Sequence, residues 1–297
     1  MKKMLLALLL SAFTAFATAQ TIVPVVWVFA LSSTQGLMVR EIINEANSIQ
    51  NKYQFVFEHK AGAGGAVGVN YVANLNQPAI LAHTASFFIR PYMSQEGSYD
   101  PEQFSMLNNY CADQPLAMVS KNFKTLADLQ KSNKASVGVL PGSITNLVVA
   151  EYKKQNTKID LVELGFKGTP EMATSVLGGH LDLSIDWLTS VMVHNELNIL
   201  GTTGVQNHGR AKSFKSQGIS GYEKITNSYY LLVNKNANAV VVQEFNDIMS
   251  RAVTAKRVQN YCTQEFGHTV NIAGPAARDL FVEKHKFWQQ AVGKIVK

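Results

Sequence analysis

The chain alternates between apolar runs and helical patterns, beginning with the run Ile22-Val23-Pro24-Val25-Val26-Trp27-Val28-Phe29-Ala30. A continuous β-branched run of this kind predicts a strand that is buried on both faces. Serine and threonine follow it, and apolar residues then recur at helical spacing on one face: Leu37, Ile42, Ile43, Ala46 and Ile49. Strand, polar loop and helix together predict a β-α unit.

The same alternation recurs along the chain. Predicted strand and helix pairs lie at 54–59 with 66–74, 135–140 with 146–155, and 159–164 with 170–177, and further strands lie at 79–83 and 181–187. Such alternation predicts parallel sheets with helices on both faces. Two apolar runs, Pro115–Ser120 and Ser228–Asn234, interrupt it and are predicted to cross between two lobes. The end of the chain, 240–265 and 275–295, is predicted to form two helices.

The first 19 residues have the pattern of a secretory signal peptide. Lys2 and Lys3 precede an apolar run from Met4 to Phe16, and Ala17-Thr18-Ala19 is a small-x-small cleavage signal. The apolar run is shorter than the roughly 20 residues that a membrane-spanning helix needs. We therefore expect a cleaved leader and a periplasmic, soluble mature protein. The alternative is a buried N-terminal helix.

The mature chain is long for a single hydrophobic core, because one domain typically holds about 100 to 150 residues. We therefore expect an α/β protein with two lobes. After the signal peptide at 1–19, residues 20–116 and 231–297 are predicted to form lobe 1, and residues 117–230 to form lobe 2. The two crossover strands connect them.

Charge and cysteine content narrow the class of protein. The formal net charge is +6, and +4 remains once Lys2 and Lys3 leave with the leader. The basic residues are scattered, so no nucleic-acid-binding patch is predicted. Cys111 and Cys262 are the only two cysteines, and an oxidising compartment favours their pairing. Two buried free thiols are the alternative.

Three polar loops each connect a predicted strand end to a predicted helix start, where open α/β sheets bind ligands. They are Ala30–Gln35, Leu140–Asn146 and Phe166–Pro170, and a fourth loop, His83–Phe88, follows another strand. Helix starts carry unsatisfied N–H groups and the positive end of the helix dipole, so several together favour an anion. The candidate ligand-binding residues in these loops are Ser32, Ser33, Thr34, Gln35, Thr84, Ser86, Gly142, Ser143, Thr145, Asn146, Lys167, Gly168 and Thr169.

Each of these residues also has a purely structural interpretation. Serine and threonine are preferred at helix N-caps for local reasons, and Thr169-Pro170 fits a cap followed by proline in the first turn. Lys167 is either a cation that faces the ligand or a solvated loop lysine. Phe87 and Phe88 fit either an aromatic wall of the site or the core.

Nucleotide binding and catalysis are disfavoured. Gly62-Ala63-Gly64-Gly65-Ala66-Val67-Gly68 opens a helix after a strand, but Val67 stands where the third glycine of G-x-G-x-x-G belongs. A tight turn with close helix packing is the better interpretation. The sequence has no G-x-S-x-G, S-x-x-K or H-E-x-x-H motif, and its histidines lack metal-ligand spacing. We expect a protein that is not an enzyme and holds neither a cofactor nor a metal.

Four segments together resemble the Bug-type receptors, the substrate-binding proteins of tripartite tricarboxylate transporters. They are the glycine loop 62–70, the loop and helix 141–151, Phe166-Lys167-Gly168-Thr169-Pro170, and Leu177-Gly178-Gly179-His180-Leu181-Asp182-Leu183. The resemblance implies a two-lobed type II periplasmic binding fold (a Venus flytrap) that closes on a small carboxylate. It also implies a membrane permease as partner and a place in the cleft for Asp186. We expect the receptor to be a monomer.

One departure from the family concerns the first loop. That loop usually is glycine-rich and ends in aspartate, whereas here it reads Ser32-Ser33-Thr34-Gln35-Gly36, with neutral Gln35 in place of the acid. The ligand is therefore open, and dicarboxylates, tricarboxylates, aromatic acids and amino acids all fit. The alternative function is a secreted sensor or adaptor that docks on a signalling protein when it closes.

Overall fold

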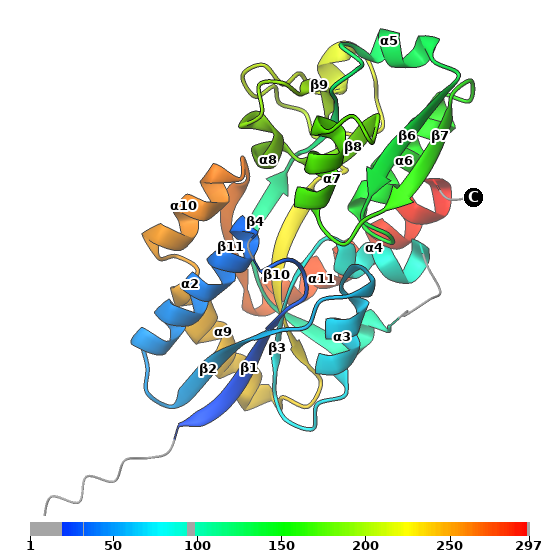
Figure 1. Cartoon of the computed structure of the whole chain (residues 1–297). Coiled ribbons are helices and arrows are strands. Elements are labelled where there is room, and N and C mark those ends of the chain that lie inside the picture. Colours follow the sequence, from blue (N-terminus) through cyan, green and yellow to red (C-terminus); the bar gives the residue numbers. More distant parts are fainter. Residues whose placement is uncertain (1–19, 32, 94–98, 296–297) are drawn as a thin grey trace, which may run out of the picture.

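The computed structural model describes residues 20–31, 33–93 and 99–295, so the predicted signal peptide at 1–19 lies outside the described residues. Two mixed sheets, each flanked by helices, form the fold (Figure 1). The six-stranded sheet has the order β11 (His268–Ala273), β4 (Phe104–Gln114), β10 (Asn227–Asn234), β3 (Ile80–Thr84), β1 (Thr21–Trp27), β2 (Tyr53–His59). The five-stranded sheet has the order β7 (Asp160–Gly165), β6 (Lys134–Val139), β8 (Leu183–Trp187), β5 (Leu116–Ser120), β9 (Asn198–Thr202).

Helices follow the strands in the order that the sequence patterns predict. Those of the six-stranded half are α2 (Thr34–Ser48), α3 (Ala66–Ala73), α4 (Ser86–Met93), α9 (Ala239–Ala252), α10 (Lys256–Gln264) and α11 (Gly274–Ile295). Those of the five-stranded half are α5 (Leu126–Lys131), α6 (Ile144–Gln155), α7 (Thr169–Leu177) and α8 (Leu188–Met192). Within the described ranges, none of the helices combines the length and hydrophobicity that crossing a membrane requires.

The buried side chains form one cluster that extends through both halves and two that stay within one half. The shared cluster joins α3, α4 and α11 to α6 and both sheets, through residues such as Val69, Phe88, Leu147 and Trp288. A second cluster packs α2, α9 and α10 on the other face of the six-stranded sheet, and a third packs α7 and α8 on the five-stranded sheet (Figure 1). The shared cluster positions the two halves relative to each other.

Neither sheet is purely parallel, which corrects the sequence-based expectation. β1 pairs in parallel with β2 and β3, and β6 pairs in parallel with β7 and β8. β10 and β4 run antiparallel in one sheet, and β5 runs antiparallel to β8 and β9 in the other. Of these strands, β4, β5 and β10 carry the chain between the sheets, since β5 directly follows β4 after Pro115 and β10 follows β9. The edge strand β11 is also antiparallel to its neighbour β4. The exact lobe boundaries stay a prediction, and β10 begins at Asn227, before the expected boundary at 230.

Two helical predictions were wrong in detail. The single helix expected over 240–265 is two helices, because a break after Ala252 redirects the chain so that α10 packs against α2 and β11. In α2 the buried face includes Met38 and Val39, while Leu37 is 42% exposed. The helix begins at Thr34, with Ser33 as its N-cap.

Candidate ligand-binding cleft

A cleft lies between the two halves of the molecule. Side chains from both halves line it, which is the arrangement expected of a ligand site between lobes. The lining residues of the six-stranded half are Trp27, Phe29, Ala30, Ser33, Gln35, Thr84 and Ser86, and those of the five-stranded half are Leu140, Ser143, Lys167, Gly168, Thr169 and Trp187.

Four helices begin at this cleft. Ser33 is the N-cap of α2, α4 begins at Ser86, Ser143 is the N-cap of α6, and Gly168 is the N-cap of α7. No side chain caps α7, because Gly168 has none to offer. Free N–H groups and helix dipoles from both halves therefore meet in one space, and that combination attracts an anion.

The first ligand loop is held by its own hydrogen bonds. Ser33 Oγ accepts a hydrogen bond from Gly36 N at 3.1 Å and donates one to Ala30 O at 2.7 Å. Trp27 Nε1 donates to the same Ala30 carbonyl at 3.1 Å. A Cβ at Gly36 would lie 3.0 Å from Leu31 O and 3.1 Å from Trp27 Nε1, so glycine lets the helix start close against the loop.

The second ligand loop is shaped by helix capping. Ser143 and Asn146 form a capping box at the start of α6, and Thr145 Oγ1 accepts a hydrogen bond from Leu140 N at 2.8 Å. Gly142 has φ of 69°, a backbone conformation that favours glycine. Gly142, Thr145 and Asn146 therefore fix the loop, while Ser143 both caps the helix and lines the cleft.

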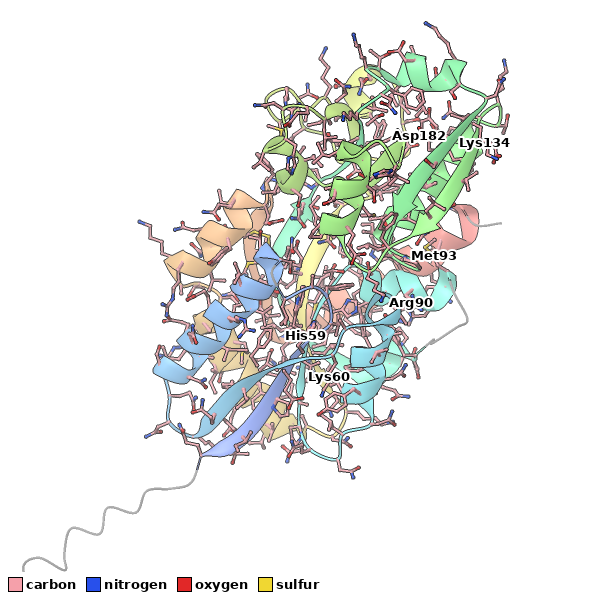
Figure 2. All side chains as sticks on the ribbon, in the orientation of Figure 1. His59, Lys60, Arg90, Met93, Lys134 and Asp182 are labelled. Carbon is pink, nitrogen blue, oxygen red and sulfur yellow. A yellow bond between two sulfur atoms is a disulfide. The ribbon has the colours of Figure 1, made fainter. Side chains whose placement is uncertain are left out.

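The two halves touch directly beside the cleft. Buried Arg90 of α4 donates from Nη1 to Pro141 O at 3.0 Å, and Ile144 N donates to Ser86 Oγ at 3.3 Å. Figure 2 shows Arg90 where α4 meets the other half of the molecule. A Cβ at Gly64 would lie 2.4 Å from Pro141 O, so the glycine loop lets the halves approach. This close packing confirms the tight-turn interpretation of residues 62–68.

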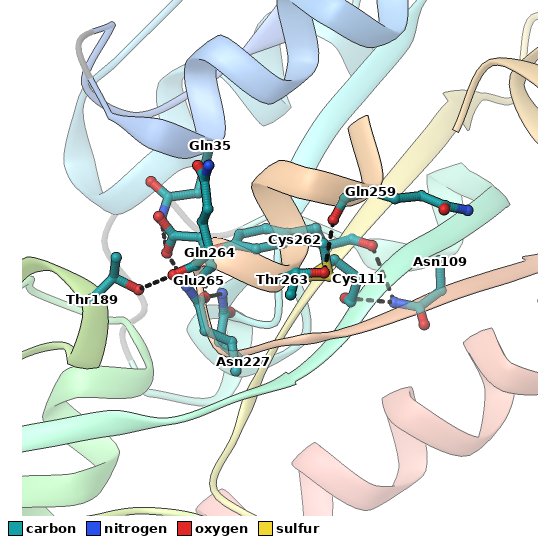
Figure 3. Close-up of a disulfide and its surroundings, with 12 residues drawn as sticks. Gln35, Asn109, Cys111, Thr189, Asn227, Gln259, Cys262, Thr263, Gln264 and Glu265 are labelled. Carbon is teal, nitrogen blue, oxygen red and sulfur yellow. Dashed lines mark hydrogen bonds between the residues drawn. A yellow bond between two sulfur atoms is a disulfide. The ribbon is translucent and has the colours of Figure 1, made fainter. Parts of the chain in front are cut away.

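Two buried carboxyl groups lie behind the lining. Asp186 is fully buried at the end of β8, and burial raises the pKa of its carboxyl to about 7. The Glu265 carboxyl acts in the same direction, whereas the Trp187 N–H and the Thr169 hydroxyl oppose the rise. Burial also raises the pKa of Glu265, which follows α10. Glu265 (Figure 3) accepts a hydrogen bond at Oε2 from Gln35 Nε2 at 2.9 Å. The same oxygen accepts a second one from Gln114 Nε2.

The disulfide expected between Cys111 and Cys262 is present. It joins β4 to α10, with the Cα atoms 5.7 Å apart (Figure 3). Cys262 precedes Glu265 by less than one helical turn, so the bond anchors the segment that carries this buried acid. In the part of the chain that the structure describes, no group of three or more His, Cys, Asp or Glu side chains could hold a metal ion.

Solved structures of periplasmic binding proteins share this architecture. The chain is similar to the periplasmic binding protein BugD with a TM-score of 0.81 and 18% identity, over 93% of this chain and 97% of that one. It has the fold of the Bug-type receptors. MatC from Rhodopseudomonas palustris with bound malate has a TM-score of 0.79 and 17% identity, over 93% of this chain and 99% of that one.

Further comparisons agree with the Bug-type fold. The R. palustris protein Rpa4515 with adipate has a TM-score of 0.77 and 18% identity, over 94% of this chain and 98% of that one. The UPF0065 protein in the tcbD-tcbE intergenic region of Pseudomonas sp. strain P51 is 20% identical over 287 residues, covering 91% of this chain and 85% of that protein. No protein-family model matches the chain. None of these relatives is described as an enzyme, and the resemblance expected from the sequence is confirmed.

The Bug-type fold brings most of the predicted loop residues to one cleft. Eight of them line it: Ser33, Gln35, Thr84, Ser86, Ser143, Lys167, Gly168 and Thr169. Thr34, Gly142, Thr145, Asn146 and Asp186 lie outside the lining, and Ser32 falls outside the described residues. Phe87 and Phe88 are fully buried in the core. Thr169 is the first residue of α7 and Gly168 its cap, so the capping interpretation of Thr169 was wrong.

Sequence reasoning missed the aromatic walls of the cleft. Trp27, Phe29 and Trp187 line it, although the first two were assigned to a buried strand and the third to a strand end. Trp27 and Trp187 are the last residues of β1 and β8, and Phe29 directly precedes the first ligand loop. An aromatic residue at or just after a strand end is therefore the signal that points to them.

Proposed function

We propose that this protein is an extracytoplasmic solute-binding protein that captures a small carboxylate in the cleft between its lobes. It delivers the carboxylate to the membrane permease of a tripartite tricarboxylate transporter and works as a monomer, without catalysis. The predicted leader at 1–19 directs it to the periplasm. The ligand-binding residues predicted from the sequence are part of this proposal.

The convergence of four helix starts on one cleft is the observation that carries the proposal. A carboxylate there receives hydrogen bonds from backbone N–H groups and interacts with helix dipoles, which cost nothing to reorganise because the loops are already fixed. Lys167, which lines the cleft, adds a positive charge. In support, two proteins of the same fold hold malate and adipate, both dicarboxylates.

Closure of the two lobes is the mechanism. Ligand binds one lobe in the open form, and the second lobe then shuts over it. The contacts from Arg90 to Pro141 and from Ile144 to Ser86 belong to the closed arrangement. A ligand that touches both lobes binds the closed form more tightly, so it shifts the population toward that form.

A thermal-shift screen of the mature protein against a panel of carboxylates tests the proposal. A ligand that binds only the folded state raises the melting temperature in a saturable way. We expect such a shift with at least one small carboxylate, together with an unchanged ligand on recovery. A flat response across the panel, from protein shown to be folded and free of copurified ligand, contradicts it.

A further inference from the structure

Two carboxyl groups next to the ligand cleft have no cationic partner among the described residues. Asp186 is fully buried and Glu265 is 2% exposed, and neither forms an ion pair with a described lysine, arginine or histidine. Buried carboxylates normally are paired or fully hydrogen-bonded, because removing the charge from water is costly. The unpartnered acceptor that they include therefore points to a ligand group with a donor.

Asp186 has one carboxylate oxygen to spare. Its Oδ1 accepts a hydrogen bond from Trp187 N at 2.7 Å, whereas its Oδ2 is buried and has no partner within the described part of the chain. Thr169, which interacts with this carboxyl, and Trp187 both line the cleft. An unsatisfied acceptor therefore lies immediately behind the cleft wall.

Gln35 is oriented by the network around Glu265. Gln114 Oε1 accepts hydrogen bonds from Asn227 Nδ2 at 2.9 Å and from the Tyr229 hydroxyl, so Gln114 must turn its Nε2 toward Glu265. Glu265 Oε2 is thus an acceptor, and Gln35 donates to the same oxygen through its own Nε2 (Figure 3). This leaves the Gln35 carbonyl Oε1 as the group that it can offer to a ligand, and Gln35 lines the cleft.

The cleft therefore offers two kinds of partner. On one side, the uncapped start of α7 supplies backbone donors, and the dipole of α6 and Lys167 supply positive charge, which together suit a carboxylate. On the other side, Gln35 Oε1 supplies an acceptor at the cleft wall, and the buried carboxyl groups of Glu265 and Asp186 lie behind it, which suits a donor with positive charge. Since this side offers acceptors and, among the described residues, no cation, it does not suit a second carboxylate, and a simple dicarboxylate satisfies only part of the site.

We propose that the cleft selects amino acids over plain carboxylates, with Gln35 receiving the ligand's ammonium group, Glu265 holding Gln35 in position, and the buried Asp186 carboxyl behind the cleft wall favouring positive charge on that side. This inference rests on the proposed function, because it assumes that a carboxylate occupies the cleft. It also explains why neutral Gln35 can stand where the family usually has aspartate. Glu265, which accepts a hydrogen bond from Gln35, supplies the acidic group instead.

Calorimetric titration with matched ligand pairs tests this selection. The pairs are propionate with alanine, succinate with aspartate, and glutarate with glutamate, whose members differ only by the amino group. We expect the amino member of at least one pair to bind tenfold or more tightly than its partner. Malate serves as a third ligand beside succinate and aspartate, since its hydroxyl replaces the ammonium group.

Variants connect the selection to the named residues. Asp186→Asn and the nearly isosteric Gln35→Met are each expected to reduce the amino-group preference at least fivefold while a plain carboxylate still binds. Asp160→Asn, an exposed change on β7, removes the same charge far from the cleft and should keep the preference. If Asp186→Asn does not fold, Gln35→Met alone decides the assignment.

The possible results distinguish a failure of the ammonium selection from a failure of the proposed function. Equal affinity within every pair, or malate binding as tightly as aspartate, overturns the ammonium selection and leaves the proposed function standing. A preference that persists in both variants overturns the residue assignment. If no carboxylate or amino acid binds the folded protein, the proposed function fails as well.

Discussion

Several polar residues in the ligand loops have two roles at once, and Ser143 illustrates this. Its side chain caps α6 in a capping box and also lines the cleft. Ser143→Ala should therefore weaken carboxylate binding and also lower the free energy of unfolding by about 1 kcal/mol, the usual cost of a lost N-cap. Titration calorimetry and urea unfolding measure the two effects.

Thr125 provides the matched control for this prediction. It forms the same kind of capping box at the start of α5, at an exposed position that does not line the cleft. Thr125→Ala should cost a similar free energy of unfolding and leave the affinity unchanged. Equal affinity of the Ser143→Ala variant and the wild type would remove Ser143 from the binding residues.

Asp186 should make stability depend on pH. Its pKa is raised from an ordinary 3.8 to about 7 by burial in the folded protein. Between these values the folded state binds more protons than the unfolded state, so the free energy of unfolding falls as pH rises from about 4 to 7. At roughly 1.4 kcal/mol per pKa unit, the effect amounts to a few kcal/mol.

Urea unfolding at pH 5 and pH 8 checks this sign. The wild type should be less stable at pH 8, and Glu265, whose pKa is also raised by burial, contributes in the same direction. Asp186→Asn cannot ionise there and should lose less stability between the two pH values. An identical loss in variant and wild type would show that Asp186 ionises normally in the folded state.

At the scale of elements, the disulfide fixes α10 against β4. Cys111 and Cys262 are 151 positions apart, so the bond closes a long loop in the unfolded chain. In the chain-entropy model this stabilises the fold by up to about 4 to 5 kcal/mol. Reduction should therefore lower the urea midpoint strongly in the wild type and leave a Cys111→Ser/Cys262→Ser double variant unaffected. A wild-type midpoint that resists complete reduction contradicts this.

The sequence predicts elements well where the pattern is local. β1, β2, β6 and α6 follow from apolar runs and helical spacing, and the glycine loop follows from its composition. The break between α9 and α10 does not, because it depends on how α10 packs against α2 and β11. Likewise β4 and α4 escaped prediction: Pro91 interrupts the helical pattern of α4, and many polar residues of β4 are buried by pairing with β10 and β11.

In the candidate site, too, the features with a local sequence pattern could be predicted and those that depend on long-range contacts could not. The loops could be found because Ser, Thr and Gly mark strand ends and helix starts, as at Ser33 and Ser143. The network of Gln35, Glu265 and Gln114 could not, since its members lie far apart in the sequence and meet only through the disulfide-anchored α10. Buried polar contacts of this kind carry no periodic signal.

At the scale of the whole molecule, function requires the two halves to close. Gly64 has φ of 60° and faces Pro141 O across the interface, where a Cβ would come within 2.4 Å. Gly64→Ala should therefore hinder closure and weaken ligand binding about tenfold or more. Gly179→Ala is the control, since Gly179 has φ of 74° with open space around its Cβ.

Both glycine variants should lose a similar free energy of unfolding, because each places alanine in the left-handed region. Small-angle scattering with and without ligand separates them further. The Gly179→Ala protein should become more compact on ligand addition, like the wild type, and the Gly64→Ala protein should not. Equal compaction of both variants would mean that this contact does not limit closure.

A crystal structure of the mature protein with the tightest ligand from the carboxylate panel tests the central claim most directly. The account predicts a carboxylate in the interlobe cleft, with its oxygens about 2.7 to 3.2 Å from the first backbone N–H groups of α7, which no side chain caps. A ligand bound elsewhere on the protein, with the helix starts at Ser143 and Gly168 untouched, would contradict it.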